Sequence, residues 1–256
     1  MLQNIAEDYE YLMIMLIVMI FVGTGSIISW IFLRPSNKNL IQKIEGIVPP
    51  FLGLPAVLFS LTAALMATSL WENYNVAIKA VRNESQSIAT LIELSDTISG
   101  SKGLELKRYA KEYAQSVVSD EWPTLSHNDE ESPATQRHFD ELRAATFTAI
   151  DSLQGTAKSQ ALMSAFQGVN DGRKTRLSFV SFDVHPVRWY AMLILAVLVQ
   201  LAVALVHTSK PRALVVAVGV ATITVLIPIC AIAFTLSSPY VGVVSISNMP
   251  FLAAIR

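Results

Sequence analysis

Four long stretches of this chain are almost entirely apolar and carry no charged side chain in their interiors. They cover residues 11–33, 47–70, 187–206 and 213–236. A helix that crosses a lipid bilayer needs about 20 mostly apolar residues. Because each stretch reaches that length, the sequence predicts an all-α integral membrane protein with four transmembrane helices.

The composition supports a membrane protein. Charged residues make up 15% of the chain and hydrophobic residues 52%, whereas a soluble domain has about 25% charged residues. The net charge is −1 and no basic run is present, so membrane lipid is an expected partner and nucleic acid is not. The single cysteine, Cys230, lies within an apolar stretch, which excludes a disulfide within the chain.

The short loops predict the orientation of the chain. Residues 34–46 contain Arg34, Lys38 and Lys43, and the turn at 207–212 contains Lys210 and Arg212. Basic short loops favour the cytoplasmic side of a membrane. We therefore expect a bacterial inner-membrane protein whose termini and middle domain are periplasmic.

Residues 71–185 form the middle part, where apolar residues recur at helical spacing. We expect a helical extramembrane domain there, between the second and third transmembrane helices. Its second helix, residues 102–119, is expected to stop near Trp122-Pro123. The predicted segments are residues 1–46 (first transmembrane helix and basic loop), 47–70 (second transmembrane helix), 71–185, 186–236 (transmembrane hairpin) and 237–256. This last segment, broken by prolines and a glycine, is expected to be a non-helical tail that packs on the extramembrane domain or on a neighbouring subunit.

Small residues form a stripe along the second span. They recur at spacings of three and four, and the same register continues past Trp71 to Ile98, which predicts one helix over residues 48–99. The stripe either lets helices approach closely or, around an oligomer axis, lines a pore. The residues concerned are Gly53, Ala56, Ser60, Ala63, Ala67 and Trp71.

The chain contains no recognisable catalytic signature. The interiors of the spans lack ionisable residues, which argues against a proton-driven pump, and for Gln200 an interhelical hydrogen bond is favoured over a pore ligand. His138 and Glu141 share a helical face, and His127 lies among acidic residues, but a solvated helix surface is the favoured interpretation. We therefore expect no catalytic residue, no cofactor and no metal.

Three motifs are similar to the bestrophin-like domain family of bacterial membrane proteins. They are Trp71-Glu72-Asn73-Tyr74 after the second span, Glu121-Trp122-Pro123 in the middle domain, and the tail from Ser238 through Pro239, Tyr240 and Gly242. Phe51-Leu52-Gly53-Leu54 also resembles a segment near the neck of bestrophins. The resemblance implies a homo-oligomeric, by analogy pentameric, ion channel whose second span lines the pore. Bestrophins keep their soluble domain in the cytoplasm, whereas the loop charges here predict the opposite side.

Two functions from different classes follow. The leading hypothesis is a homo-oligomeric ion channel, with ions and further copies of the chain as partners. The alternative is a non-conducting membrane scaffold or sensor whose extramembrane helical domain binds a partner. An enzyme acting at the membrane surface would need a polar cleft around His127, His138 and Glu141, and it is the least favoured.

Overall fold

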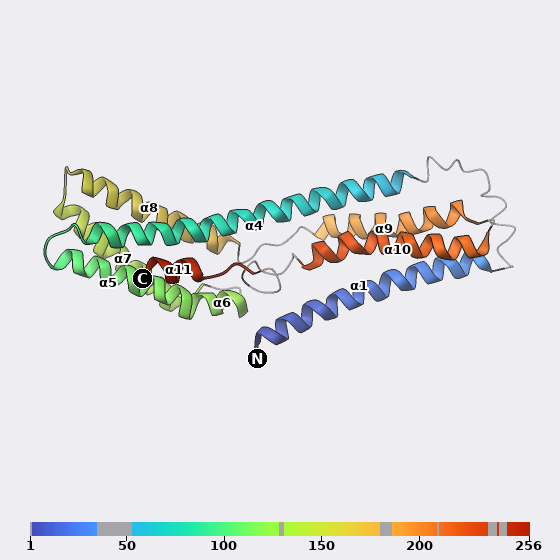
Figure 1. The fold of residues 1–256 in the computed structure, drawn as a ribbon, viewed down its shortest axis with the longest axis horizontal. Helices are drawn as coiled ribbons and strands as arrows, with labels where there is room; N and C mark the ends of the chain where they lie inside the picture. The colour runs from blue at the N-terminus through green and yellow to red at the C-terminus, as the bar shows by residue number, and fades with distance from the viewer. Residues whose placement is uncertain are drawn as a thin grey trace. The chain divides into compact units, whose positions relative to one another are not determined.

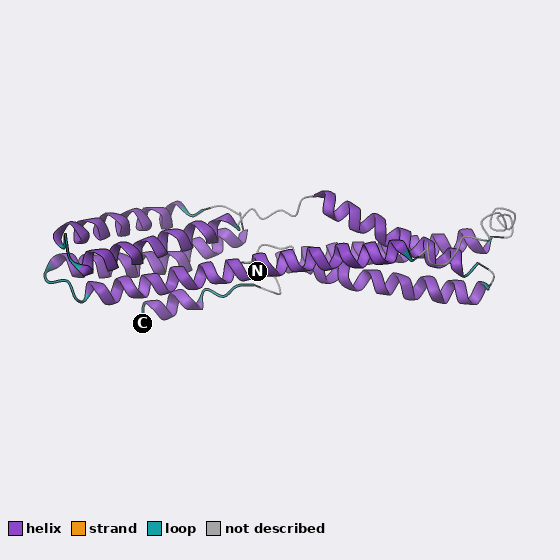
Figure 2. Ribbon diagram, turned by 90° about the horizontal axis from the view of Figure 1, so that it is seen from above, coloured by secondary structure: helices purple, strands orange, loops and turns teal. Residues whose placement is uncertain are grey.

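The computed structural model describes residues 2–34, 53–127, 131–179, 186–208, 210–234, 240 and 245–256. All regular structure within these residues is helical, and they contain no strand (Figure 2). The predicted all-α class is therefore confirmed. The helices labelled in Figure 1 and the short π-helix η2 are α1 (Leu2–Leu33), α4 (Leu54–Ser95), α5 (Ser101–Ser116), η2 (Val117–Glu121), α6 (Trp122–His127), α7 (Pro133–Ser152), α8 (Ala157–Ser178), α9 (Pro186–Val206), α10 (Pro211–Phe234) and α11 (Met249–Ala254).

Four of the described helices are long and apolar enough to cross a membrane, as predicted. The qualifying segments are Tyr11–Leu33, Leu54–Ser95, Val187–Val206 and Pro211–Ala233. The described part of the second span begins later than the predicted residue 47, because residues 35–52, with most of the basic loop, lie outside the described residues.

The chain divides into two compact units, and the division falls inside α4, after Trp71. We call them the membrane unit, which comprises α1, the first part of α4, α9 and α10, and the polar unit, which comprises the rest of α4, α5 to α8 and α11. The predicted helix over residues 48–99 is present over Leu54–Ser95, so it ends four residues earlier than predicted, and residues 48–52 lie outside the described residues. Its 42 residues correspond to a length of about 63 Å at 1.5 Å per residue.

The membrane unit is held by apolar packing between its helices. Gly25 of α1 lies very close to α10, because a Cβ atom there would be 2.8 Å from the Thr222 hydroxyl oxygen. A small residue is needed at such a close approach between helices. The main buried cluster consists of Phe21, Phe59, Ala63, Met66, Leu70, Met192, Ala196, Val199, Val225, Ile229 and Ile232.

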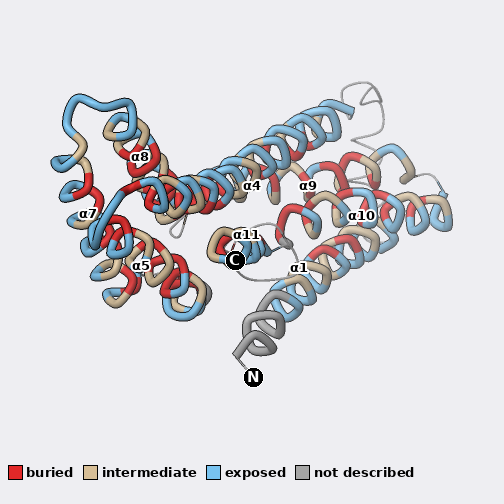
Figure 3. Tube along the Cα trace, turned by 60° about the vertical axis from the view of Figure 1, so that its left-hand side comes forward, coloured by how far each residue is buried: buried red, intermediate tan, exposed pale blue. Residues whose placement is uncertain are grey.

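In the polar unit the same register of α4 forms the core. Residues Ala77, Val81, Ile88 and Leu91 are almost completely buried there. Figure 3 draws the buried positions of α4 in red. They pack with α5, α7 and α8 through residues such as Leu106, Leu142, Leu162 and Val169. An amphipathic helix buries the stripe that recurs at spacings of three and four, which is the pattern observed.

The expected stop at Trp122-Pro123 is wrong. After Ser116 the chain widens into the π-helix η2 and then continues as α6. The helical segment runs through Pro123, which has no amide hydrogen to donate to the preceding turn and follows directly after the wider turn of η2. The wider turn changes the register of the residues that follow, and Glu121 at its end is fully buried.

The expected non-helical tail is wrong over Met249–Ala254, which form α11. Pro250 occupies the first turn of this helix, where proline is favourable rather than disruptive. Tyr240, Ile246 and Phe251 belong to the buried core of the polar unit. Pro239 and Gly242, two of the motif residues, lie outside the described residues.

Candidate functional site

Within the membrane unit, α4 has one covered side and one uncovered side. Phe59, Ala63, Met66 and Leu70 pack against the other described helices. The opposite side carries large apolar side chains that these helices leave exposed. They include Leu54, Val57, Leu58, Leu61 and Leu65, with exposed fractions between 51% and 63%.

The small-residue stripe runs along the flank between these two sides. Ala63 is buried, whereas Gly53, Ala56, Ser60 and Ala67 are exposed. Trp71, at the end of this part of α4, is 67% exposed. The Ser60 hydroxyl donates to the Val57 carbonyl oxygen at 2.9 Å, so its polar group is satisfied within the helix. The position of the stripe fits helix packing and pore lining alike, and both remain predictions.

Gln200 joins three helices of the membrane unit. Its side-chain nitrogen donates to the Phe21 carbonyl oxygen at 3.1 Å and to the Thr222 hydroxyl at 2.9 Å. Its side-chain oxygen accepts from the Thr24 hydroxyl at 2.9 Å. The side chain is completely buried. The favoured interhelical hydrogen bond is thus present, and the amide links α1, α9 and α10.

The polar unit contains a buried group of charges, which we call the charge cluster. Its members are Glu84 on α4, Tyr113 on α5, Glu121 at the end of η2, and Arg173 and Arg176 on α8. Arg173 is 3% exposed and the other four are completely buried. Charged residues are almost never buried to this degree unless they are paired.

Arg176 lies between the two carboxylates. Its Nε donates to Glu84 Oε2 at 2.8 Å, and its Nη2 donates to Glu84 Oε1 at 3.1 Å and to Glu121 Oε2. The Tyr113 hydroxyl donates to Glu84 Oε1. Such charge-assisted, two-point contacts are the stronger class of protein hydrogen bonds.

Arg173 extends the cluster toward the surface. Its Nη1 donates to Glu121 Oε2 at 3.0 Å, and its Nη2 lies 3.0 Å from Glu121 Oε1. The same Nη2 donates to Glu131, whose side chain is 45% exposed, and to Gln136 at 3.2 Å. The cluster therefore connects α4, α5, η2, α7 and α8 of the polar unit.

Within the cluster, Arg176 keeps its charge and Tyr113 stays neutral. Burial opposes the charge on Arg176, but Glu84 and Glu121 outweigh that cost and hold the pKa of Arg176 well above its usual range. Burial raises the pKa of the Tyr113 hydroxyl well above its usual value, and Glu84 raises it further. Tyr113 thus stays a neutral hydrogen-bond donor at physiological pH.

The C-terminal segment covers this cluster. The Tyr240 hydroxyl donates to the Arg176 carbonyl oxygen at 2.7 Å, and the Arg176 guanidinium carbon lies 5.7 Å from the centre of the Phe251 ring. Trp122 packs edge-on against Tyr240 and Phe251, at 5.3 and 6.0 Å between ring centres. The structure therefore brings Glu121-Trp122 and Tyr240, from two of the motifs, into one site.

Two members of the cluster were missed by sequence reasoning. Glu84 lies in the register of the α4 stripe and Glu121 in the motif, whereas Arg173 and Arg176 belong to neither pattern. A signal was present, because the two arginines continue the buried face of α8. The apolar residues of that face are Leu162, Ala165, Phe166 and Val169.

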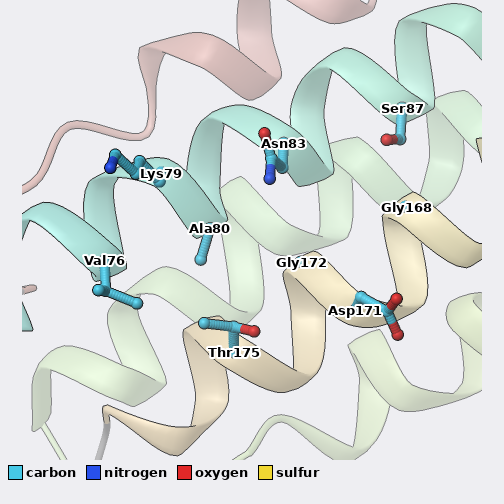
Figure 4. Close-up of a pocket in the computed structure, with 9 residues that line it drawn as sticks. All are labelled: Val76, Lys79, Ala80, Asn83, Ser87, Gly168, Asp171, Gly172 and Thr175. Atoms are coloured by element: carbon cyan, nitrogen blue, oxygen red, sulfur yellow. The ribbon is translucent and has the colours of Figure 1, made fainter.

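Beside the cluster, α4 and α8 line an open groove with a volume of about 370 Å³ (Figure 4). Gly168 and Gly172 face α4 at its floor. A Cβ atom at Gly172 would lie 2.9 Å from the Glu84 backbone. The polar groups of the groove come from both helices, and they are Lys79, Asn83, Ser87, Asp171 and Thr175.

These features define an all-helical, multi-pass membrane protein whose polar unit contains a buried charge cluster. The model of the Bestrophin-like domain family matches residues 19–251, so the chain belongs to that family. A search of curated proteins and a search of solved structures each found no match.

Proposed function

We propose that this protein is a homo-oligomeric ion channel in which α4 lines the pore. The observation that carries the proposal is the uncovered apolar side of α4, which the described helices of the membrane unit leave exposed. Family membership supports it, because the analogy to bestrophins implies a ring of subunits, five by analogy, with this span at the axis.

The chemistry of the spans favours passive conduction. The apolar segments lack the ionisable residues that coupled transporters use. The described part of α4 before Trp71 offers only apolar, small and hydroxyl side chains. A ring of such side chains forms a hydrophobic constriction, which controls ions by wetting and drying. The proposed role is non-enzymatic.

We further propose that the polar unit lies outside the bilayer, in the periplasm of a bacterial cell, with both termini on the same side. The support is the loop charge, including Lys210 and Arg212 between α9 and α10.

The test is ion flux into liposomes that contain the purified full-length chain. Single cysteines at Ser60, Leu61 and Ala67, in a Cys230→Ala background, are then exposed to a charged thiol reagent. We expect modification on the pore-lining side to reduce the flux by more than half. A cysteine at Val220, on an exposed face of α10, serves as the control and should leave flux unchanged. Absence of flux under every ion gradient would refute the channel.

The scaffold or sensor remains the second candidate, and the groove between α4 and α8 is the observation that favours it. Its mixed polar lining, with a lysine, an aspartate and an asparagine, could hold a polar partner. This function predicts no flux, together with loss of partner binding when Lys79 and Asp171 are replaced by alanine.

A further inference from the structure

Helices α5 and α7 bring together three metal-ligating side chains on the surface of the polar unit. They are Glu112 of α5 with His138 and Glu141 of α7, and one ligand atom from each lies within 4.8 Å of the other two. His138 Nδ1 is already 3.1 Å from Glu141 Oε2. Sequence spacing shows only the pair on α7, and the packing of α5 supplies the third ligand.

We propose that Glu112, His138 and Glu141 form a binding site for a divalent transition-metal ion of the zinc class. One imidazole nitrogen and two carboxylate oxygens match the ligands of zinc, whereas calcium and magnesium prefer oxygen alone. Three protein ligands leave a fourth position open to solvent or to an external ligand. This proposal does not depend on the channel function.

The spacing suits such an ion after a small side-chain adjustment. Zinc binds these ligands at about 2.0–2.2 Å, which places tetrahedral ligand atoms about 3.3–3.6 Å apart. The present spread of up to 4.8 Å therefore closes by roughly 1 Å. The side chains are between 35% and 49% exposed, so their rotation meets little resistance.

The backbone under the site is held in place. Tyr113 and Phe139, the neighbours in sequence of Glu112 and His138, pack with their ring centres 5.6 Å apart. One turn further along, the hydroxyls of Ser116 and Thr135 are 2.8 Å apart. Ligands carried on packed helices lose little freedom when they bind, which favours binding.

Arg108 is a charged neighbour of the proposed metal site, and it competes with the metal ion for the Glu112 carboxylate. Its Nη1 lies 3.4 Å from Glu112 Oε1, and its guanidinium stacks on the Tyr109 ring at 4.3 Å. An exposed pair of this length contributes little, so the guanidinium can turn away. Removal of Arg108 should therefore tighten metal binding.

The experiment measures zinc binding by the purified, tag-free and chelator-treated full chain, using competition with a chromogenic chelator. We expect one zinc ion per chain. Glu112→Gln, His138→Ala and Glu141→Gln should each weaken binding by about tenfold or more, the scale on which disturbance of a metal site acts. Arg108→Ala should strengthen it several-fold.

Two matched controls make the result specific. Asp140→Asn removes a neighbouring α7 carboxylate that pairs with Arg143 at 3.2 Å, and His207→Ala removes a histidine of the membrane unit. Neither should change the affinity. The proposal is overturned if wild-type protein binds no zinc, if the three ligand variants bind as tightly as wild type, or if His207→Ala causes the loss. Arg108→Ala keeps the test decisive even where a ligand variant folds poorly, because weaker binding by this variant would contradict the site.

Discussion

Arg176 is the central positive charge of the buried charge cluster in the polar unit. It is completely buried and contacts both Glu84 and Glu121. A buried ion pair is worth little compared with well-packed apolar residues, but removal of one partner leaves a charge stranded away from water. Here, removal of one arginine would leave two buried carboxylates with only one buried arginine to balance their negative charges.

We therefore predict that Arg176→Leu destabilises the protein by about 3–5 kcal/mol, the cost of breaking a buried pair. Thermal unfolding of the full chain in detergent measures the change. Lys107→Ala is the control, because Lys107 pairs with Asp96 at 2.7 Å on the surface, where a pair contributes less than about 1 kcal/mol. Equal effects of the two substitutions would contradict the stabilising role of the cluster.

Sequence reasoning found the site residues that belong to a motif or share one helix with their partner. Glu121 was selected as part of a motif, and His138 and Glu141 by their spacing. Arg173, Arg176 and Glu112 were not selected, because their partners lie on other helices. Only the packed structure shows that Arg176 meets Glu84 across a separation of 92 residues.

At the level of helices, α4 and α8 approach each other closely within the polar unit. Gly172 lies against the backbone of Glu84, and Gly168 lies against Ser87. This proximity allows Arg176 of α8 to reach the Glu84 carboxylate on α4. Position 172 therefore requires glycine because the backbone of α4 is too close for a larger side chain, and not because of its backbone conformation.

We predict that Gly172→Ala lowers stability by about 1–3 kcal/mol, as overpacking does in a tight core. Its Cβ atom would lie 2.7 Å from the Glu84 Cβ atom, so the helices must separate. Gly219→Ala on α10 provides the comparison, since a Cβ atom there meets nothing within 4 Å. Melting temperatures in detergent should fall for the first variant and stay constant or rise for the second.

The presence of a helix was predictable where the sequence has a long apolar stretch, as in the four spans, or a continuous helical register, as along the whole of α4. Helix ends were less predictable. The π-helix at Val117–Glu121 and helix α11 escaped because prolines were taken as breaks. Pro250 lies in the first turn of α11, where proline is favourable, whereas Pro123 follows directly after the wider turn of η2 within one continuous helical segment.

Considered as a whole, the polar unit combines two separate parts of the sequence around two buried tyrosines. Tyr113 belongs to the inserted helices and Tyr240 to the C-terminal segment. Burial raises the pKa of both hydroxyls above the usual value of about 10. Their folded forms are therefore neutral, while the unfolded chain ionises near that value.

We predict a loss of stability at high pH that depends on Tyr113. A raised folded pKa contributes stability that is fully present below about pH 10 and is lost as the pH rises toward the folded pKa. The drop in melting temperature between pH 8 and pH 11 should be smaller for Tyr113→Phe than for wild type. Tyr109→Phe, which changes a partly exposed ring beside Arg108, should show the wild-type drop. An undiminished drop for Tyr113→Phe would contradict the prediction.

The polar unit combines helices from the middle of the chain with the C-terminal segment, so its folding depends on the order in which these segments are synthesised. Tyr240 and Phe251 complete the packing around Arg176, yet they emerge after α9 and α10. Synthesis must therefore deliver the last two spans before that core can close. The polar unit of a nascent chain therefore stays without this part of its core until α9 and α10 have been synthesised.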